Sequence, residues 1–372
     1  MNRRRPEDLK VCVLQVPPFD PARMLGGAEV VAVHLVRALA SSADVTVLHG
    51  FPADARPAGS AAEPGFPARV IAAFPLDEHV REHGHISPRL TGPALRSLQE
   101  ADVIVTVERT LDLPADAPRI ACLGGVGYPH TLDVLRHRAW DRLVVPSPFV
   151  ARQVREHAPQ AANVSVVANG IDLTHFTPRP AGQARDPVEV RLLVAGRPGW
   201  DKGFRQALGL ARAMEAGGTP TTLMCFAQPD GFGAAGFTAQ LRREAEAHAV
   251  RLRIMPWQPH HRMPAVYHRA DLTLCLGDAA EGFGLVAAES VACGTPVAAT
   301  PSGFLADMLP PGHGLYLVPP GADPAELVPT AREAMRHGPD QCRHRGRPYI
   351  GSHYGLPRMT TAFRHLVEEL AA

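Results

Sequence analysis

Residues 281–289, Glu-Gly-Phe-Gly-Leu-Val-Ala-Ala-Glu, decide the fold because they join a buried strand to a helix across a turn with two glycines. The short apolar run at 272–276 just before them predicts a buried strand. Residues 285–291 have helical composition and are followed by Gly294, which predicts the helix end. The first glutamate therefore lies on a turn at the end of a strand. The second lies just beyond the first turn of a helix that begins near Gly284.

The spacing of these two glutamates fits a long charged ligand. Eight residues at a helical rise of about 1.5 Å separate the carboxylates by at most about 12 Å, roughly the span of a ribose, a diphosphate and a sugar. Free amides at a helix N-terminus bind phosphate, and each carboxylate would accept hydrogen bonds from a sugar diol. The simpler alternative is an ordinary turn between a strand and a helix, with one exposed and one partly solvated glutamate.

The composition describes a globular protein and excludes several functional classes. At 372 residues the chain is too long for one ordinary core, so two domains are expected. The 38 Lys and Arg nearly balance 37 Asp and Glu, so no basic excess predicts nucleic-acid binding. No apolar run approaches the roughly 18 residues of a membrane span, and no apolar signal core follows the first residues. The 6 cysteines include no C-x-x-C pair, which favours a reducing compartment without structural zinc, so we expect a cytoplasmic protein.

Strands and helices alternate along both halves of the sequence, a pattern that builds parallel sheets covered by helices on both faces. The first half predicts strands at 11–16, 45–48, 103–107, 120–123, 143–145 and 164–167, and helices at 28–39 and 148–157. The second half predicts strands at 190–195, 221–226, 251–255, 272–276, 296–299 and 315–318, and helices at 204–216, 237–247, 263–269, 285–291, 324–336 and 359–370. The fold class is therefore α/β, with two Rossmann-like doubly wound domains.

A segment rich in Pro, Gly, Gln and Arg at 178–187 is the best candidate for a linker between the two domains. The predicted N-terminal domain is 1–178, joined by the C-terminal helix at 355–372, and the predicted C-terminal domain is 188–354. Open α/β sheets bind ligands outside the carboxyl ends of their strands. Two such domains in tandem are therefore expected to face a cleft, as in an enzyme.

Two other glycine turns stand between a strand and a helix, where backbone amides form an anion-binding corner. Gly26 and Gly27 precede the first helix, although tight packing explains a Gly-Gly turn equally well. Residues 196–203, Gly-Arg-Pro-Gly-Trp-Asp-Lys-Gly, precede the first helix of the second half. Among 38 basic residues only Lys10 and Lys202 are lysine. A compact ammonium differs physically from a guanidinium, which makes Lys202 a candidate functional residue.

The segment at 74–90 contains a short match to a zinc-protease pattern. His79-Val-Arg-Glu82-His83 fits H-x-x-E-H, which puts two histidines and a glutamate on one side of a helix. The chain has 18 histidines, and the neighbouring prolines and glycine leave room for two or three helical turns at most, so an accidental match is favoured. We interpret the segment as a polar loop that contacts a substrate, with His83 as a candidate residue.

Five motifs occur in a fixed order along nearly the whole chain. They are G-G-A-E at 26–29, V-V-P-S at 144–147, N-G-I-D at 169–172, G-R-x-x-x-x-K-G at 196–203 and E-G-F-G-L-V-A-A-E-S-V-A-C-G-T-P-V at 281–297. Together they resemble the family-4 retaining glycosyltransferases of the GT-B fold, whose signature is two glutamates separated by seven residues. Each motif alone is weak, and their combination is specific.

The resemblance implies a role for each motif. Arg197 and Lys202 would grip the donor diphosphate and neutralise the charge that grows on the leaving group. Glu281 would hold sugar hydroxyls, and Glu289 would accept hydrogen bonds from the ribose. The implied catalytic residues are thus Arg197, Lys202 and Glu281, and the implied donor-binding residues are Gly26, Gly27, Gly196, Gly282, Phe283, Gly284, Leu285 and Glu289.

The sequence departs from the family on the acceptor side, in the N-terminal domain. Members usually carry a histidine after the strand at 120–123, where this chain continues Gly-Gly-Val-Gly-Tyr-Pro-His at 124–130. Glycines allow a ligand to approach the backbone closely, so main-chain groups at Gly125, or the imidazole of His130, would replace the usual histidine. Gly125, His130 and His83 are therefore the candidate acceptor-side residues.

The donor side departs as well, since the usual Pro-Ser before the signature is Leu276-Gly277, and 301–304 read Pro-Ser-Gly-Phe in place of the usual Gly-Gly. The family implies sugar transfer with retention from a UDP- or GDP-linked donor, with no cofactor and no obligatory metal. No basic amphipathic helix indicates a lipid acceptor, so a small soluble acceptor is expected. The preference for Arg over Lys with abundant Ala and Pro resembles high-GC bacterial coding, which favours bacterial specialised-metabolite (antibiotic) or thiol biosynthesis.

Other readings of the sequence stay open. A nucleotide-sugar epimerase on the same fold would act on the donor alone, and a non-catalytic nucleotide-sugar-binding subunit would bind it without turnover. The sequence leaves open a homodimer, the sugar, the nucleotide base, and whether the acceptor attacks through oxygen or sulfur.

Overall fold

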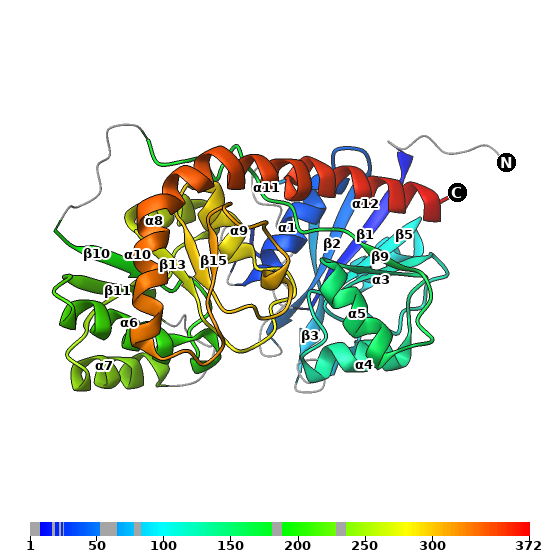
Figure 1. Cartoon of the computed structure of the whole chain (residues 1–372). Coiled ribbons are helices and arrows are strands. Elements are labelled where there is room, and N and C mark those ends of the chain that lie inside the picture. Colours follow the sequence, from blue (N-terminus) through cyan, green and yellow to red (C-terminus); the bar gives the residue numbers. More distant parts are fainter. Residues whose placement is uncertain are drawn as a thin grey trace. The chain divides into compact units, whose positions relative to one another are not determined.

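The computed structural model describes residues 8–16, 19–21, 24, 26–52, 65–77, 83–180, 188–227 and 236–372 (Figure 1). The chain folds into two compact units. Unit 1 is Met1–Gly170 with Leu356–Ala372, and unit 2 is Ile171–Gly355. Each unit contains a parallel sheet with packed helices, so the predicted α/β class with two Rossmann-like domains is confirmed.

Within the described residues, unit 1 is built on a parallel sheet of seven strands in the order β3-β2-β1-β5-β7-β8-β9. The strands are β1 (Lys10–Gln15), β2 (Asp44–Pro52), β3 (Arg69–Leu76), β5 (Val103–Val107), β7 (Arg119–Cys122), β8 (Arg142–Val145) and β9 (Val164–Val166). The short strands β4 (His85–Ile86) and β6 (Thr110–Leu111) form a separate parallel pair. Because all seven strands run parallel, their carboxyl ends lie along one edge of the sheet.

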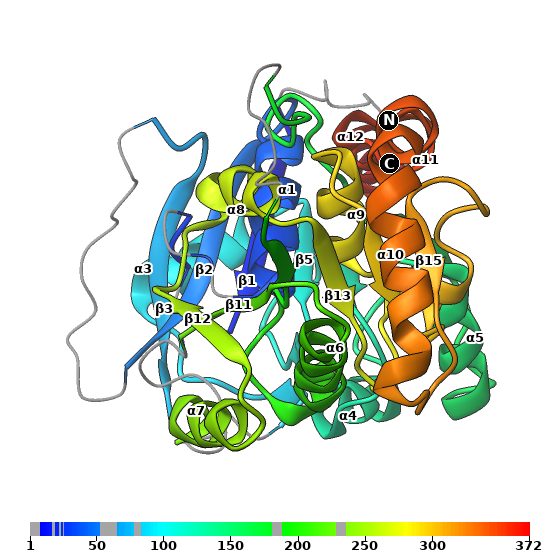
Figure 2. The ribbon, with the colours of Figure 1, turned by 60° about the vertical axis from the view of Figure 1, so that its left-hand side comes forward.

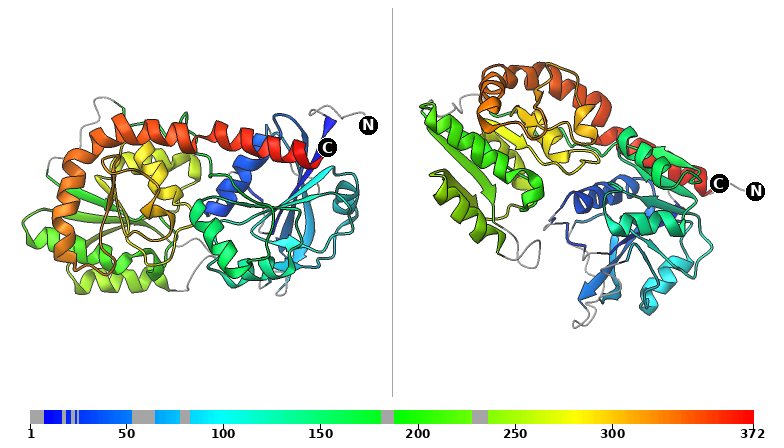
Figure 3. Two further views of the ribbon diagram at one scale, coloured as in Figure 1. Left: turned by 45° about the vertical axis from the view of Figure 1, so that its right-hand side comes forward. Right: turned by 60° about the horizontal axis from the view of Figure 1, so that its bottom comes forward.

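Helices bury both faces of this sheet. They are α1 (Gly27–Leu39), α3 (Gly92–Gln99), α4 (Pro129–His137), α5 (Pro148–His157) and α12 (Leu356–Leu370). Helix α3 shares a buried cluster with β1, β3 and β5, and α4 and α5 share another with β7 and β8. The C-terminal helix α12 lies along α1 and so belongs to unit 1 (Figure 3).

In the described part of unit 2, six parallel strands follow the order β12-β11-β10-β13-β14-β15. They are β10 (Val190–Leu193), β11 (Thr221–Phe226), β12 (Arg251–Met255), β13 (Leu272–Cys275), β14 (Val297–Ala299) and β15 (Leu315–Leu317). Helices α6 (Phe204–Ala216), α7 (Phe237–Ala247) and α10 (Pro324–Gln341) bury one face, with α6 and α10 side by side (Figure 2). Helix α8 (Met263–Arg269) follows β12, and α9 (Leu285–Ala292) packs on β13 and β14.

The boundary between the compact units falls before the predicted linker. Residues after Gly170 pack with unit 2: Ile171 N donates to Tyr354 O at 2.8 Å, and Arg347 donates to Leu173 O at 2.6 Å and to Phe176 O. The predicted N-terminal domain of 1–178 therefore extends eight residues too far, past the end of the first segment of unit 1 at Gly170. The anchors of 171–176 are long-range hydrogen bonds, which local composition does not encode.

Strand β3 occupies residues for which the sequence predicts no strand. Its last three residues belong to the segment 74–90, so the interpretation of that whole segment as a polar loop is wrong there. The strand contains Ala72, Ala73 and Pro75, residue types that weaken the sequence signal for a strand. It is the edge strand of the sheet, where a proline is tolerated because one side of its backbone needs no ladder partner. Pairing with β2 therefore overrides the local propensity.

Helix α10 continues beyond the predicted end at 336, through Pro339, into the π-helical turn η5 (Cys342–Gly346) and helix α11 (Arg347–Tyr354). Gly338 and Pro339 follow the predicted end directly. In the structure Gly338 allows close packing instead, because a Cβ there would lie 2.4 Å from Cβ of Pro296. The π turn η5 in turn packs on Gly314, where a Cβ would lie 2.2 Å from Sγ of Cys342.

The contact at Gly314 predicts a large loss of stability for Gly314→Ala. Its φ of +91° is left-handed, which costs a residue with a Cβ roughly 1–2 kcal/mol, and overpacking adds roughly 1–3 kcal/mol. We expect the free energy of unfolding to fall by about 2–4 kcal/mol in urea titrations. Gly321→Ala is the matched control, since its φ is +67° and no described atom lies within 4 Å of its Cβ position. If both variants lose the same free energy of unfolding, steric overlap with Cys342 does not explain the loss in Gly314→Ala.

Candidate functional site

Two turns meet at the carboxyl edge of the unit 2 sheet. One follows β10 and the other follows β13, and these strands are parallel neighbours, with Leu192 paired to Leu272. The turns approach backbone to backbone because both carry glycine where they touch. A Cβ on Gly203, whose φ is +78°, would lie 2.4 Å from the carbonyl carbon of Leu276, and a Cβ on Gly277 would lie 2.4 Å from O of Asp201. The glycines thus let two segments distant in sequence form one site.

Lys202 and Glu281 are the side chains that these turns bring together. Lys202 Nζ lies 2.5 Å from Glu281 Oε1, and the two side chains are 21% and 34% exposed. The stem of Lys202 lies beside Gly196, where a Cβ would stand 3.7 Å from it. An ammonium and a carboxylate that are both reachable from solvent provide one group for a phosphate and one for a hydroxyl.

Arg197 lies on the same turn, but pairs with a different acid. Its guanidinium lies 3.0 Å from Asp201 Oδ2, with both side chains more than a third exposed. Exposed ion pairs of this kind contribute roughly 0–1 kcal/mol, so a ligand phosphate would compete easily for the guanidinium. The structure therefore places Arg197 within the loop of Lys202, without a contact to Glu281 among the described pairs.

The backbone of Glu281 is held by the segment that follows β14. Glu281 forms a parallel bridge with Gly303, and Phe304 N donates to Glu281 O at 2.8 Å. Gly303 has a φ of +63°, and a Cβ there would lie 2.3 Å from Glu281 O. The neighbouring hydroxyl of Ser302 is buried and has no hydrogen-bond partner among the described residues. The departure of 301–304 from the family pattern thus borders the backbone of Glu281 directly.

The glycine turn after Glu281 ends in an uncapped helix. Gly284, with a φ of +92°, is the N-cap of α9, and no described side chain accepts a hydrogen bond from the first amides, which begin at Leu285. Gly282 is half-buried. Phe283 is 3% exposed and packs against Phe304 at 5.8 Å, so its side chain belongs to the core and only its backbone can face a ligand. The free amides and the helix dipole make this terminus attractive for an anion.

Glu289 occupies the second turn of α9 and is 5% exposed. Its Oε1 accepts from Nε2 of His260 at 2.8 Å, and its Oε2 accepts from the hydroxyl of Tyr267 at 2.8 Å. Burial and the neighbouring carboxylate raise the pKa of Tyr267 well above its usual value, so this phenol stays protonated and donates. A carboxylate has about four lone-pair sites, so capacity for a ligand hydroxyl remains.

Sequence reasoning missed His260 and Tyr267. Tyr267 falls in a correctly predicted helix, α8, and His260 in the 3₁₀ turn η3 (His260–Arg262) before it. A buried tyrosine on a short helix looks like ordinary core, and only the fold brings it to a carboxylate on another helix. A hollow of about 570 Å³ lies beside the same elements, lined among others by Met255, Gln258 and Arg262.

The predicted residues of unit 1 lie at the carboxyl edge of its own sheet. Gly26 is the N-cap of α1, and its amide donates to Glu29 Oε2, 2.5 Å away, so that amide is already occupied. Gly27 is exposed at the first turn of α1. The carbonyl of His83 accepts from Nε of Arg109 at 3.0 Å. Gly125 is open, with no described atom within 4 Å of its Cβ position.

His130 is near an acid that the sequence did not single out. Its Nε2 lies 3.9 Å from Glu108 Oε2, and Gly124 N donates to Glu108 Oε1 at 2.7 Å. Glu108 has a left-handed φ of +62°, a conformation that no pattern in the sequence predicts. The zinc pattern at His79 and Glu82 lies outside the described residues, and the part of the chain that the structure describes contains no cluster of three or more metal-ligating side chains.

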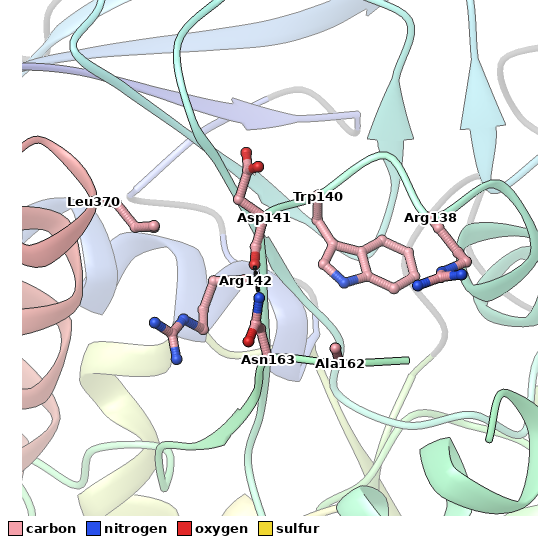
Figure 4. Close-up of a pocket in the computed structure, with 7 residues that line it drawn as sticks. All are labelled: Arg138, Trp140, Asp141, Arg142, Ala162, Asn163 and Leu370. Carbon is pink, nitrogen blue, oxygen red and sulfur yellow. Dashed lines mark hydrogen bonds between the residues drawn. The ribbon is translucent and has the colours of Figure 1, made fainter. Parts of the chain in front are cut away.

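Unit 1 also has a hollow of about 380 Å³ at the opposite edge of its sheet (Figure 4). It is lined by Arg138, Trp140, Asp141, Arg142, Ala162, Asn163 and Leu370. Strands β8 and β9 begin here, so the hollow lies at the amino ends of the strands. Open α/β sheets bind ligands beyond the carboxyl ends, which separates this hollow from the candidate site.

Comparison with known proteins agrees with this architecture. The family model for Glycosyltransferase Family 4 matches residues 25–175, and the model for Glycosyl transferases group 1 matches residues 183–347. The sucrose-phosphate synthase of Thermosynechococcus elongatus has a TM-score of 0.71 at 18% identity, over 97% of this chain and 99% of that one. The Anabaena protein HepE in complex with UDP and glucose has a TM-score of 0.73 at 16% identity, over 97% and 100%.

A D-inositol 3-phosphate glycosyltransferase of Thermobispora bispora is 34% identical over 237 residues, which is 60% of this chain and 52% of that protein. The chain spans about half the length of the curated relatives it matches. Two parallel α/β units matched in this way are the GT-B class of glycosyltransferase. The chain belongs to family 4 of that class. Among the described residues, no helix combines the length and apolar character that crossing a bilayer requires.

Proposed function

We propose that this glycosyltransferase moves a sugar from a UDP- or GDP-linked donor to a small soluble acceptor, with retention at the anomeric carbon and without an obligatory metal. The Lys202–Glu281 pair, 2.5 Å apart beside the uncapped start of α9, is the observation that carries the proposal. It combines a cation and free amides for a diphosphate with a carboxylate for sugar hydroxyls. The residues proposed as catalytic, Arg197, Lys202 and Glu281, all lie on the two turns at the carboxyl edge of the unit 2 sheet.

Charge balance supports a metal-independent reaction. Negative charge grows on the diphosphate as the bond to the sugar breaks, and preorganised cations and amides aimed at that charge stabilise the transition state. Lys202, Arg197 and the N-terminus of α9 supply such groups. We therefore expect EDTA to leave turnover unchanged.

Retention is proposed because the leaving phosphate can serve as the base. The acceptor attacks the anomeric carbon from the face that the diphosphate leaves, through an oxocarbenium-like state. The bond from the anomeric carbon to the phosphate oxygen breaks, the new bond to the acceptor atom forms, and the acceptor proton moves to that phosphate oxygen. In this scheme Glu281 orients the sugar, and no second carboxylate is needed as a nucleophile.

The hollow beside η3 suggests how the donor is oriented in the site. Glu289, assigned to the ribose, is held by His260, and η3 also borders the 570 Å³ hollow. A base attached to that ribose would enter the hollow, while the diphosphate would run towards Lys202. Gly26 and Gly27 of unit 1 are proposed to contact the phosphates, and Gly27 is the stronger candidate because it is exposed and the Gly26 amide already donates to Glu29.

The acceptor is proposed to be small, and two of the matched proteins are named after small molecules. Their names include D-inositol 3-phosphate glycosyltransferase and a glycosyltransferase involved in avilamycin A biosynthesis. The proposed context, bacterial specialised-metabolite (antibiotic) or thiol biosynthesis, rests on the preference for Arg over Lys and the abundant Ala and Pro of the sequence.

Donor profiling tests the proposal. A ligand at 100 times its Kd stabilises the folded state by about 2.7 kcal/mol, so the correct donor should raise Tm by several degrees. We expect a shift with UDP-glucose or GDP-mannose, followed by acceptor-dependent release of nucleoside diphosphate and an unchanged anomeric configuration by ¹H NMR. An isomerised donor without acceptor would identify an epimerase instead. Binding without turnover for every acceptor would identify a non-catalytic subunit.

A further inference from the structure

Glu108 adopts a conformation that glutamate rarely takes. It follows β5 directly, at the carboxyl edge of the unit 1 sheet, with a φ of +62°. Residues with a Cβ are strained in this left-handed region, and such strain collects at functional sites. The backbone is locked there, since Glu108 N donates to Cys122 O at 2.8 Å. An asparagine or glycine would adopt this conformation with less strain, so the retained carboxylate needs a reason.

The neighbouring loop is shaped around that carboxylate. Gly124 N donates to Glu108 Oε1 at 2.7 Å, and a Cβ on Gly124 would lie 2.8 Å from the same oxygen. Gly124 therefore both binds Oε1 and leaves room for it. The second oxygen, Oε2, lies 3.9 Å from Nε2 of His130, which is too long for a direct hydrogen bond. The side chain is 20% exposed, so Oε2 remains able to accept from a ligand.

An aromatic surface stands next to the carboxylate. The rings of Tyr128 and His130 stack at 5.5 Å with an interplanar angle of 14°, and Tyr128 is 51% exposed. No described atom lies within 4 Å of the Cβ positions of Gly125 and Gly127, so the loop has open space around it. A flat aromatic surface suits the C–H face of a sugar or cyclitol ring, and a carboxylate accepts from its hydroxyls.

We propose that Glu108, Tyr128 and His130 recognise the acceptor, and that Glu108 selects a polyhydroxylated ring presenting a hydroxyl or ammonium group there, and not a phosphate. This inference rests on the proposed function, because it names the acceptor of that transfer. A carboxylate can only accept hydrogen bonds, so a hydroxyl or ammonium satisfies it and a phosphate ester is repelled. Arg109, the next residue in the chain, directs its Nε to His83 O at 3.0 Å. The acceptor would thus differ from the inositol phosphate named for the Thermobispora relative.

Matched acceptor series test this selectivity, each with one ring in a neutral, an amino and a phosphorylated form. Glucose, glucosamine and glucose 6-phosphate form one series; myo-inositol, an amino-deoxyinositol and myo-inositol 3-phosphate form the other. Acceptor-dependent release of nucleoside diphosphate at saturating donor gives kcat and KM. For the ring that the enzyme prefers, we expect kcat/KM of the neutral or amino form to exceed kcat/KM of the phosphorylated form at least about 10-fold. A preference for the phosphorylated form, or use of no ring in either series, would overturn the inference.

Variants assign the selectivity to the charge. Glu108→Gln should raise KM for the preferred acceptor at least about 10-fold and narrow the discrimination against its phosphorylated form. Glu108→Gly relieves the strained φ, so it should keep or raise Tm while losing the same selectivity. Glu100→Gln is the control, because Glu100 is an exposed acid of unit 1 paired with Lys10. An unchanged acceptor profile in Glu108→Gln would refute the role. If no nucleotide-sugar donor raises the Tm of the wild-type protein, the proposed function itself is refuted.

Discussion

Lys202→Met is expected to lower kcat by roughly 100- to 1,000-fold, the loss seen when one preorganised donor to a developing negative charge is removed. Methionine keeps the length and apolar stem that lie beside Gly196, so the turn after β10 should keep its shape. Removing the ammonium leaves Glu281 without its 2.5 Å partner and places an unbalanced carboxylate beside the donor phosphates. The measurement is steady-state turnover with the donor that gives the largest thermal shift.

The chain offers a matched control for this experiment. Lys10 is the other lysine of the sequence, and it forms an exposed ion pair with Glu100 at 2.8 Å. Lys10→Met should leave kcat and KM unchanged. The double variant Lys202→Met with Glu281→Gln should lose less than the two single losses combined, because the residues act as a pair. Full activity in Lys202→Met would remove the basis of the proposed mechanism.

Glu289→Gln is expected to weaken donor binding and to lower stability together. The carboxylate accepts from both His260 and Tyr267, and an amide offers a single acceptor oxygen, so one buried donor loses its partner. An unsatisfied buried group costs about 1–3 kcal/mol. If Glu289 also binds the ribose, the variant should lose the preference for a ribonucleotide over its 2′-deoxy analogue. Competition by UDP and dUDP in the thermal-shift assay measures that preference.

A second variant separates the two roles of Glu289. Tyr267→Phe removes one hydrogen bond to the carboxylate and keeps the ring that packs against Phe176. It should lower the free energy of unfolding by a similar amount, about 1–3 kcal/mol, while keeping the preference for UDP over dUDP. Loss of that preference to the same degree in both variants would show that Glu289 acts only through the packing of α8 on α9.

Several elements of unit 2 could be predicted to the residue. Strands β11 and β12 and helices α7 and α8 have the predicted bounds, because each is a short periodic run closed by a turn signal. Predictions failed where long-range packing overrides local preference. Strand β3 forms despite Ala and Pro75, since β2 supplies its hydrogen bonds, and α10 continues past Gly338 because that glycine lies against Pro296.

The residues of the candidate sites also fall into those that the sequence predicts and those that only the structure reveals. Lys202, Glu281 and the start of α9 could be named from motifs, because each lies in a glycine turn after a strand. Glu108, His260 and Tyr267 could not. Their partners are 16, 29 and 22 residues away, on other elements, and neither motif nor spacing marks them.

The sequence by itself determined the α/β class, the alternation of strands and helices and the identity of the turns, because hydrophobic period and glycine position are local properties. The tertiary structure decided which turns meet. Adjacent parallel strands β10 and β13 bring Lys202 to Glu281 over 79 residues, with glycines that allow the two backbones to touch. It also decided that Glu289 is buried between His260 and Tyr267, and that Glu108 holds a strained conformation over Gly124. Strand order and close packing create these arrangements, and both arise only when distant segments fold together.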